Sequence, residues 1–214
     1  MPSTCWTTPS AVLTTQMDPA RLLNNTCTTA RVGVIVLGVG HSGTSTISCE
    51  LRRLGLVFRG RTRMCEDAGV VELNERIARR LNLHRRRVDN FSDIERFVNA
   101  NPHPSTWFEM DARRLVSRLP VPFVLKDPRF VWTLHYWTPL FKTLPMLMHV
   151  TRAPREILRS HVARREMVTS ADVRTRQLWD AWQLSQWPGC AVSFSINDLS
   201  TRVSRSNTHG QRHR

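Results

Sequence analysis

The sequence predicts an α/β protein with three layers (α/β/α), in which helices cover both faces of a mostly parallel sheet of about five strands. Two observations carry this prediction. Short apolar runs bounded by glycine or proline alternate with longer amphipathic stretches, which is the pattern of a parallel sheet whose strands are joined by helices. The 214 residues, of which 41% are hydrophobic, suffice for one domain with a substantial core.

The predicted strands are short apolar runs, and the predicted helices are the longer stretches between them. The strands are expected at 32–37, 55–58, 121–125, 145–150 and 191–195. The helices are expected at 44–54, 67–83, 111–119, 131–142, 155–166 and 173–186. In the second helix the apolar residues form one stripe, which Asp67 is placed to cap. Asn74 falls within that stripe, so burial there requires that its amide is hydrogen-bonded.

A glycine-rich turn separates the first predicted strand from the first predicted helix. Gly38, Gly43 and Ser45 match the spacing of the nucleotide-triphosphate loop G-x-x-x-x-G-K-[ST]. The backbone N–H groups of such a turn and the dipole of the following helix favour a phosphate group. Thr44 stands where that loop has the lysine that reaches the β- and γ-phosphates. The sequence therefore predicts a P-loop-type fold that binds a phosphate donor other than ATP or GTP.

Two further segments place cationic side chains directly after predicted strands. Lys126-Asp-Pro-Arg129 follows the third strand, and Arg152 follows the fourth, with Ser160 eight residues further on. Ligands of open α/β sheets lie at the carboxyl ends of the strands, so these cations are expected beside the glycine turn. The fork of an arginine together with a hydroxyl suits recognition of a phosphate.

Together these segments resemble the sulfotransferase family that uses 3′-phosphoadenosine 5′-phosphosulfate (PAPS). The family's phosphosulfate loop is similar to Gly38-Val-Gly-His-Ser-Gly-Thr-Ser45, and its K-D-P turn is similar to Lys126-Asp-Pro128. Its 3′-phosphate element, an arginine after a strand and a serine eight residues on, is matched by Arg152 and Ser160. A weaker similarity lies at Cys65-Glu-Asp67. The resemblance extends over residues 31–200.

The resemblance implies transfer of a sulfuryl group from PAPS to a hydroxyl or an amine of a glycan or other acceptor, with no metal. It implies that Lys126 neutralises the transferring group and that Glu66 is the candidate base. The family usually has arginine or lysine where this chain has His41, which is therefore a candidate for both catalysis and cofactor binding. The implied cofactor-binding residues are Gly38, Gly40, His41, Ser42, Gly43, Thr44, Ser45, Arg152 and Ser160.

The net charge of +14 is spread along the chain, and all but two of the 31 basic residues are arginine. Such a field favours anionic partners, among them an acidic glycan acceptor. Nucleic acid is disfavoured, because the arginines lack an aromatic-interleaved pattern or a recognition helix. Two alternatives stay open: a P-loop enzyme similar to nucleotide kinases, and a non-catalytic relative that binds nucleotides or nucleic acid. The sequence does not indicate an oligomeric state.

The ends of the chain and its cysteines indicate in which cellular compartment the protein is expected. Residues 1–30 are predicted to be a poorly ordered leader, residues 31–200 the sulfotransferase-like domain, and residues 201–214 a basic tail. No run approaches the ~20 apolar residues of a membrane span, and no signal peptide is evident. The five scattered cysteines have no metal-binding spacing and favour reduced thiols. The prediction is a cytoplasmic protein, with the Golgi lumen kept as the alternative.

Overall fold

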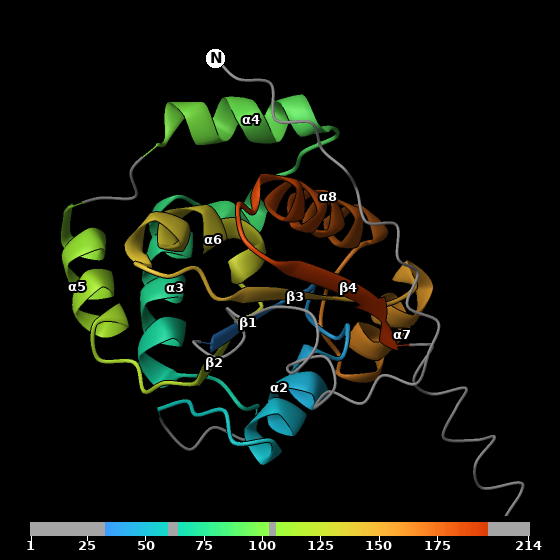
Figure 1. The fold of residues 1–214 in the computed structure, drawn as a ribbon. Coiled ribbons are helices and arrows are strands. Elements are labelled where there is room, and N and C mark those ends of the chain that lie inside the picture. Colours follow the sequence, from blue (N-terminus) through green and yellow to red (C-terminus); the bar gives the residue numbers. More distant parts are fainter. Residues whose placement is uncertain (1–32, 60–63, 103–105, 197–214) are drawn as a thin grey trace, which may run out of the picture.

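The computed structural model describes residues 33–59, 64–102 and 106–196. Within these residues, four parallel strands form one sheet in the order β2-β1-β3-β4 (Figure 1). The α/β prediction with a parallel sheet is confirmed, with four strands rather than five. The strands are β1 (Gly33–Leu37), β2 (Phe123–Lys126), β3 (Met146–Thr151) and β4 (Ala191–Ser195). The predicted leader and tail lie outside the described residues.

The strand predicted at 55–58 is reduced to a single bridge between Val57 and Phe123. Val57 N donates to the carbonyl of Pro122 at 2.9 Å, and its own carbonyl accepts from Val124 N at 2.9 Å. Gly55 precedes this bridge with φ +98°, and Arg59 N turns away to donate to Asp67 Oδ2 at 3.0 Å. The chain therefore bends on both sides of Val57, and pairing stops after one residue.

Seven α-helices and two short 3₁₀ turns connect these strands within the described residues. The helices are α2 (Thr44–Arg53), α3 (Ala68–Arg80), α4 (Phe91–Ala100), α5 (Thr106–Val116), α6 (Phe130–Trp137), α7 (Pro154–Ala163) and α8 (Ser170–Gln186). The 3₁₀ turns are η2 (Leu83–Arg85) and η3 (Thr138–Leu140). Asp67 caps α3 as expected, since its Oδ1 accepts from Gly69 N at 3.1 Å and Val70 N at 3.2 Å.

Three helical segments differ from the prediction. Helix α4 was not predicted; Asn90 caps it by accepting from Asp93 N at 3.1 Å, and Ile94 and Phe97 are buried. The helix expected at 131–142 ends at Trp137 and continues only as η3, where Pro139 lacks the N–H group that an α-helix needs. The helix expected at 111–119 lies at Thr106–Val116 instead.

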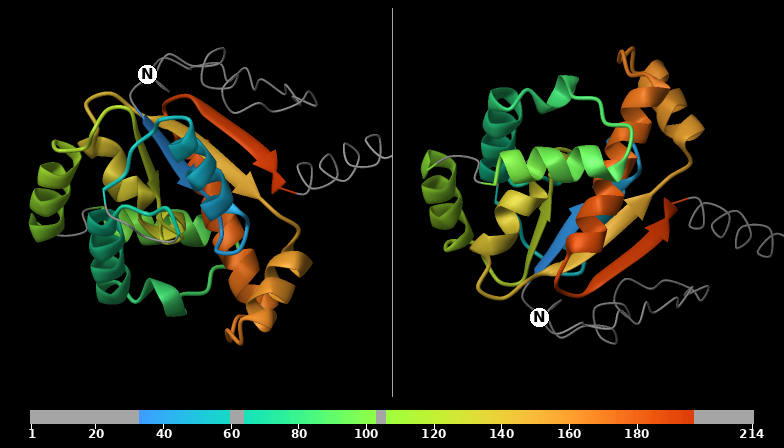
Figure 2. Two further views of the ribbon diagram at one scale, coloured as in Figure 1. Left: turned by 90° about the horizontal axis from the view of Figure 1, so that it is seen from below. Right: turned by 90° about the horizontal axis from the view of Figure 1, so that it is seen from above.

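The sheet is buried on both faces, which makes the three layers that the sequence predicts. Ile35, Leu37 and Leu125 pack into a core with α3, α5 and α6. The alternate residues Val34 and Val36 pack into a second core with α2. Figure 1 shows α2 below the sheet and α6 and α8 above it. In Figure 2, α2 crosses the strands in the view from below, and α4 and α8 lie in front of them from above.

The register of the strands brings the segments that follow them to one edge of the sheet. Val36 of β1 is paired with Lys126 of β2, and Leu37 is paired with His149 of β3. The turn after β1 therefore lies between the segments that follow β2 and β3. Helix α7 lies beyond the arrowheads of the strands in Figure 2. The expected meeting of the three segments at the carboxyl edge is thus produced by the topology.

His135 of α6 is half-buried and packs against aromatic residues, and the desolvation of its ring predicts a loss of stability in acid. Its Nδ1 lies 3.2 Å from Gln183 Nε2, and its ring contacts Tyr136 and Trp179. Burial lowers the pKa of His135 from 6.5 to about 3. The unfolded chain therefore takes up this proton below about pH 6.5 and the folded chain does not, so stability falls as pH falls, by about 2 kcal/mol at pH 5.

Urea unfolding of a His135→Gln variant measures this contribution. The glutamine carbonyl keeps an acceptor for Gln183, which lies 3.2 Å from the His135 ring, but it does not titrate. The variant should lose about 2 kcal/mol less than the parent between pH 7.5 and pH 5. Equal losses in the two proteins would show that His135 is protonated in the folded state.

Candidate active site

The turn between β1 and α2 is shaped as an anion-binding loop. At Gly38 a Cβ atom would lie 2.5 Å from the carbonyl oxygen of Val150, so only glycine fits. Gly43 immediately precedes α2 with φ +100°, and His41 also lies in the left-handed region with φ 67°. Ser42 Oγ is buried and has no hydrogen-bond partner among the described residues. A buried hydroxyl that has no hydrogen-bond partner and lies at the N-terminus of a helix is well placed to donate to a bound anion.

Lys126 and Glu66 form an ion pair beside this loop, although they are 60 residues apart in the sequence. Lys126 is the last residue of β2, and its side chain is only 2% exposed. The Glu66 side chain is 15% exposed. In the sequence, Glu66 directly precedes Asp67, which caps the N-terminus of α3. A cation and a carboxylate that the sequence analysis assigned to one reaction are therefore in direct contact.

A disulfide holds this carboxylate next to the loop's helix. Cys49 in α2 is bonded to Cys65, and Ser48 Oγ donates to the carbonyl of Cys65 at 2.8 Å. The expectation of reduced thiols is wrong for this pair. Residue spacing gave no sign of it, because the two cysteines meet only when the 65–67 segment packs against α2. Glu66 is thereby fixed one residue from a covalent link to the helix that begins at Thr44.

Arg152 and Ser160 reach the loop from the opposite side. Arg152 directly follows β3, and its Nη1 donates to the backbone carbonyl of His41 at 3.3 Å. Ser160 of α7 also contacts His41, because its Oγ lies 3.0 Å from His41 Nδ1. Both predicted members of the 3′-phosphate element therefore meet at the glycine turn. The loop that follows β1 lies between the segment that carries these two residues and the strand that ends at Lys126.

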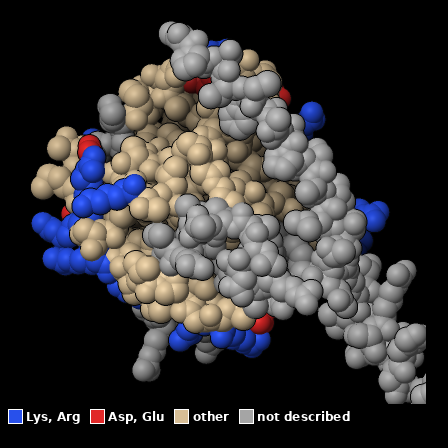
Figure 3. All heavy atoms as spheres, viewed as in Figure 1, with Lys and Arg blue, Asp and Glu red and all other residues tan. Residues whose placement is uncertain are grey.

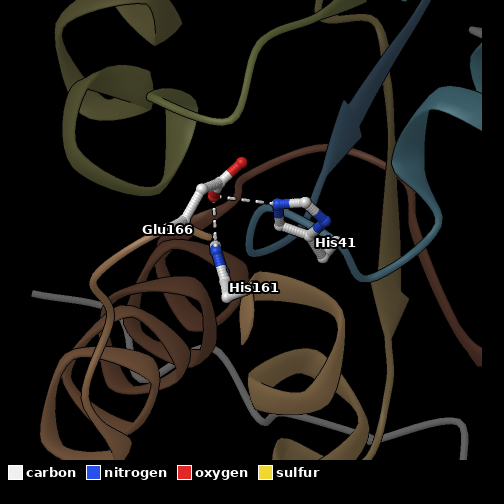
Figure 4. A group of neighbouring side chains, drawn as sticks. All are labelled: His41, His161 and Glu166. Atoms are coloured by element: carbon white, nitrogen blue, oxygen red, sulfur yellow. Dashed lines mark hydrogen bonds and ion pairs between the residues drawn. The ribbon is translucent and has the colours of Figure 1, made fainter. Parts of the chain in front are cut away.

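His41 has two partners that the sequence analysis did not identify as site residues (Figure 4). Glu166 Oε2 lies 3.1 Å from His41 Nε2 and 2.6 Å from His161 Nδ1. The rings of His41 and His161 have centroids 4.1 Å apart. Burial, and then the nearby His161, lower the pKa of His41, while Glu166 opposes this change. No spacing in the sequence connects His161 to Glu166 or to His41.

Behind Lys126, the next residues tie the edge of the sheet to α3. Asp127 is buried and accepts from Arg129 N at 2.7 Å. Burial raises the pKa of Asp127 to about 6, even though Arg129 acts in the opposite direction. Asn74 is also buried, and its Oδ1 accepts from Thr133 and Trp137, which confirms the expected hydrogen bonding. These contacts hold the position of the Lys126 backbone relative to α3.

A surface cavity of about 360 Å³ lies between α3 and α5, beside Asp67. Three arginines (Arg59, Arg114 and Arg118) and two aspartates (Asp67 and Asp111) line it, so the cations exceed the carboxylates by one. Figure 3 shows basic side chains gathered on the same side of the molecule, over the region of α5 in Figure 1. The cavity therefore offers positive charge close to the segment that carries Glu66.

Comparisons with known proteins do not give the chain a family. No protein-family model and no curated protein sequence matches it. Among solved structures, TT1252 from Thermus thermophilus is similar over 83% of this chain and 97% of its own, with 18% identity and a TM-score of 0.41. A protein described as a putative kinase from Chloroflexus aurantiacus is similar over 85% and 97%, with 14% identity and a TM-score of 0.36. Likenesses this distant carry neither a family nor an activity to this chain.

The helices give one further fact about the setting of the site. None of those in the described part of the chain has the length and apolar character needed to cross a bilayer.

Proposed function

We propose that the protein is a PAPS-dependent sulfotransferase. The observation that carries the proposal is the Lys126–Glu66 pair, held at the edge of the sheet beside a phosphate loop in which threonine replaces the usual lysine. Sulfuryl transfer needs a cation where negative charge develops on the leaving oxygen and a base for the acceptor proton. The pair offers both groups at one position.

In the proposed reaction, the acceptor oxygen or nitrogen forms a bond to sulfur while the bond from sulfur to the 5′-phosphate oxygen breaks. The acceptor proton passes to the Glu66 carboxylate. Lys126 leaves its ion pair with Glu66 to neutralise the leaving oxygen of 3′-phosphoadenosine 5′-phosphate (PAP). The loop amides from Gly40 to Ser45 stabilise the same oxygen, and holding donor and acceptor in line supplies the rest of the rate.

The 3′-phosphate of the nucleotide is assigned to Arg152 and Ser160. Arg152 donates to the His41 carbonyl and to Glu156 Oε2, at 3.3 and 3.2 Å, so its guanidinium is already oriented. Its side chain is about one-third exposed, which leaves N–H donors for a ligand. Arginine and hydroxyl donors together suit a phosphate dianion.

Replacing Arg152 by leucine should weaken PAP binding about 10- to 100-fold, because a charge-assisted hydrogen bond contributes about 1.5–3 kcal/mol. Isothermal titration calorimetry with PAP measures the change. The matched control is Arg155→Leu, since Arg155 is exposed on the first turn of α7. Equal losses of affinity in both variants would mean that only general positive charge is involved.

The acceptor proposed for this site is anionic. Asp67 is one of the residues that line the arginine-rich cavity between α3 and α5, and it is the neighbour in the sequence of the candidate base Glu66. A sulfated or carboxylated glycan would be attracted by this charge. The Cys49–Cys65 disulfide supports an oxidising compartment such as the Golgi lumen over the cytoplasm of the initial prediction, since disulfides persist where thiols are not kept reduced.

A phosphotransferase similar to nucleotide kinases is the second candidate. The observation that favours it is Asp127, a buried acid that follows the strand next to the loop, where such enzymes hold Mg²⁺. Two observations oppose this function. Asp127 already accepts a hydrogen bond from Arg129 N, and burial raises its pKa to about 6, which disfavours the ionised carboxylate that Mg²⁺ needs. Thr44 also lacks the ammonium group that the γ-phosphate requires.

A transfer assay separates the two candidates. The full chain is incubated with sulfur-labelled PAPS in the presence of a metal chelator, and separately with γ-labelled ATP and Mg²⁺. Acidic glycans, peptides and small alcohols serve as acceptors in both series. Label transferred from PAPS supports the proposal. Label transferred only from ATP with Mg²⁺ would replace it by the kinase.

A further inference from the structure

Two imidazoles and one carboxylate meet beside the loop that follows β1 (Figure 4). His41 lies in the loop, His161 in the last turn of α7, and Glu166 in the turn before α8. One ligand atom from each residue lies within 4.8 Å of the others. Three donors from separate segments therefore converge on a volume the size of one metal ion.

The donor distances are close to those of an occupied zinc site. Glu166 Oε2 lies 2.6 Å from His161 Nδ1 and 3.1 Å from His41 Nε2. Donors that bind a tetrahedral zinc ion at ~2.0–2.2 Å are about 3.3 Å from one another. The donor atoms of the two histidines lie within 4.8 Å of each other, so they would approach by up to about 1.5 Å to complete a coordination shell. Two histidines and a glutamate also leave a fourth position open for water or an anion.

The ligands are held in place by contacts that do not use their donor atoms. Glu166 N donates to the carbonyl of His161 at 3.0 Å, and the carbonyl of Glu166 accepts from Val168 N at 3.1 Å. The other ring nitrogen of His41, Nδ1, lies 3.0 Å from Ser160 Oγ. A hydrogen bond at the second nitrogen fixes the ring orientation of metal-binding histidines. The cluster therefore has supporting contacts as well as ligands.

The fold itself gives little reason for these side chains. His161 is buried, and its Nε2 has no hydrogen-bond partner among the described residues. The Glu166 side chain is 45% exposed, yet it points at two histidines rather than into solvent. The buried imidazole of His161 and the exposed carboxylate of Glu166 lie next to the loop residue His41. A metal ion bound by these three side chains would require this arrangement.

We propose that His41, His161 and Glu166 form a binding site for a divalent transition metal, with zinc as the best fit to two imidazoles and a carboxylate. The ion would tie the phosphate loop to the turn between α7 and α8. It would also put positive charge beside a loop whose sequence has threonine and histidine where cations are usual. Mg²⁺ prefers oxygen ligands and keeps several of its own waters, so two imidazoles and one carboxylate suit zinc better than Mg²⁺.

Titration of the full chain with Co²⁺, in the absence of nucleotide, tests the site. Visible absorption should report one tightly bound Co²⁺ in low-coordinate geometry, and Zn²⁺ should displace it. Glu166→Gln, at an exposed position that does not endanger folding, and His161→Asn should each weaken binding at least about tenfold. The matched control is Glu95→Gln on the exposed face of α4, which should bind like the parent.

Loss of affinity in Glu166→Gln but not in Glu95→Gln supports the site. Unchanged cobalt affinity in Glu166→Gln, or no absorbance of a coordinated ion in the parent, overturns it. The measurement is independent of the proposed sulfotransferase activity, because it uses no nucleotide and reads only the binding of cobalt. Failure of one proposal therefore leaves the other to its own test.

Discussion

Replacement of Lys126 by methionine should lower the rate of sulfuryl transfer about 10²- to 10³-fold. The Lys126 ammonium is placed beside the phosphate loop, and its removal takes away the cation that stabilises the leaving oxygen. Methionine matches the length of the buried lysine stem, so the packing at the end of β2 is kept. Initial rates with labelled PAPS measure the effect, with kcat expected to fall more than KM rises.

Lys142→Met is the matched control, because Lys142 is the other lysine of the chain and is exposed. Its rate should equal that of the parent. Circular dichroism establishes that both variants are folded. A Lys126→Met variant that is folded and fully active would remove Lys126 from the reaction and leave the Glu66 contact as a structural ion pair.

Replacement of Asn74 by leucine should lower the free energy of unfolding by about 3 kcal/mol. Asn74 Oδ1 accepts from Trp137 Nε1 at 2.7 Å and from Thr133 Oγ1 at 2.8 Å, and all three groups are buried. Leucine has a similar shape but leaves the indole N–H of Trp137 unpaired. For a chain of this size the melting temperature should fall by about 6–12 °C.

Asn99→Leu makes the same chemical change on the exposed face of α4 and should shift the melting temperature little. Since Thr133 and Trp137 belong to α6, which follows the Lys126–Arg129 segment, Asn74→Leu should also reduce activity at temperatures below its own melting point. A variant as stable as Asn99→Leu would show that the hydrogen bonds to Asn74 contribute no net stability.

The parallel sheet could be predicted because its strands are buried on both faces and read as unbroken apolar runs. The 55–58 run looked the same, but its pairing depends on the bends at Gly55 and Arg59, which place only Val57 against β2. Helix α4 was missed although Asn90 and the spacing of Ile94 and Phe97 were sufficient signals. Local sequence patterns were therefore enough to predict most helices and strands, whereas tertiary contacts determined where those elements end.

The site was predictable only as far as the topology dictates it. Lys126 ends β2 and Arg152 directly follows β3, and both strands are parallel neighbours of β1, so this sheet brings both residues to the loop. The Cys49–Cys65 disulfide and the approach of Glu166 to His41 depend on how two turns pack. Arg165, with φ 59°, lies in the turn that places Glu166, and nothing in its residue type announces that conformation.

The central claim is that the edge of the sheet binds a nucleotide with phosphate at both its 3′ and its 5′ position. Calorimetric titration of the full chain in chelator, with PAP and then with adenosine 5′-phosphate, measures this directly. The account predicts that PAP binds at least about tenfold more tightly, because Arg152 and Ser160 engage the 3′-phosphate. Equal affinity for the two nucleotides would contradict it.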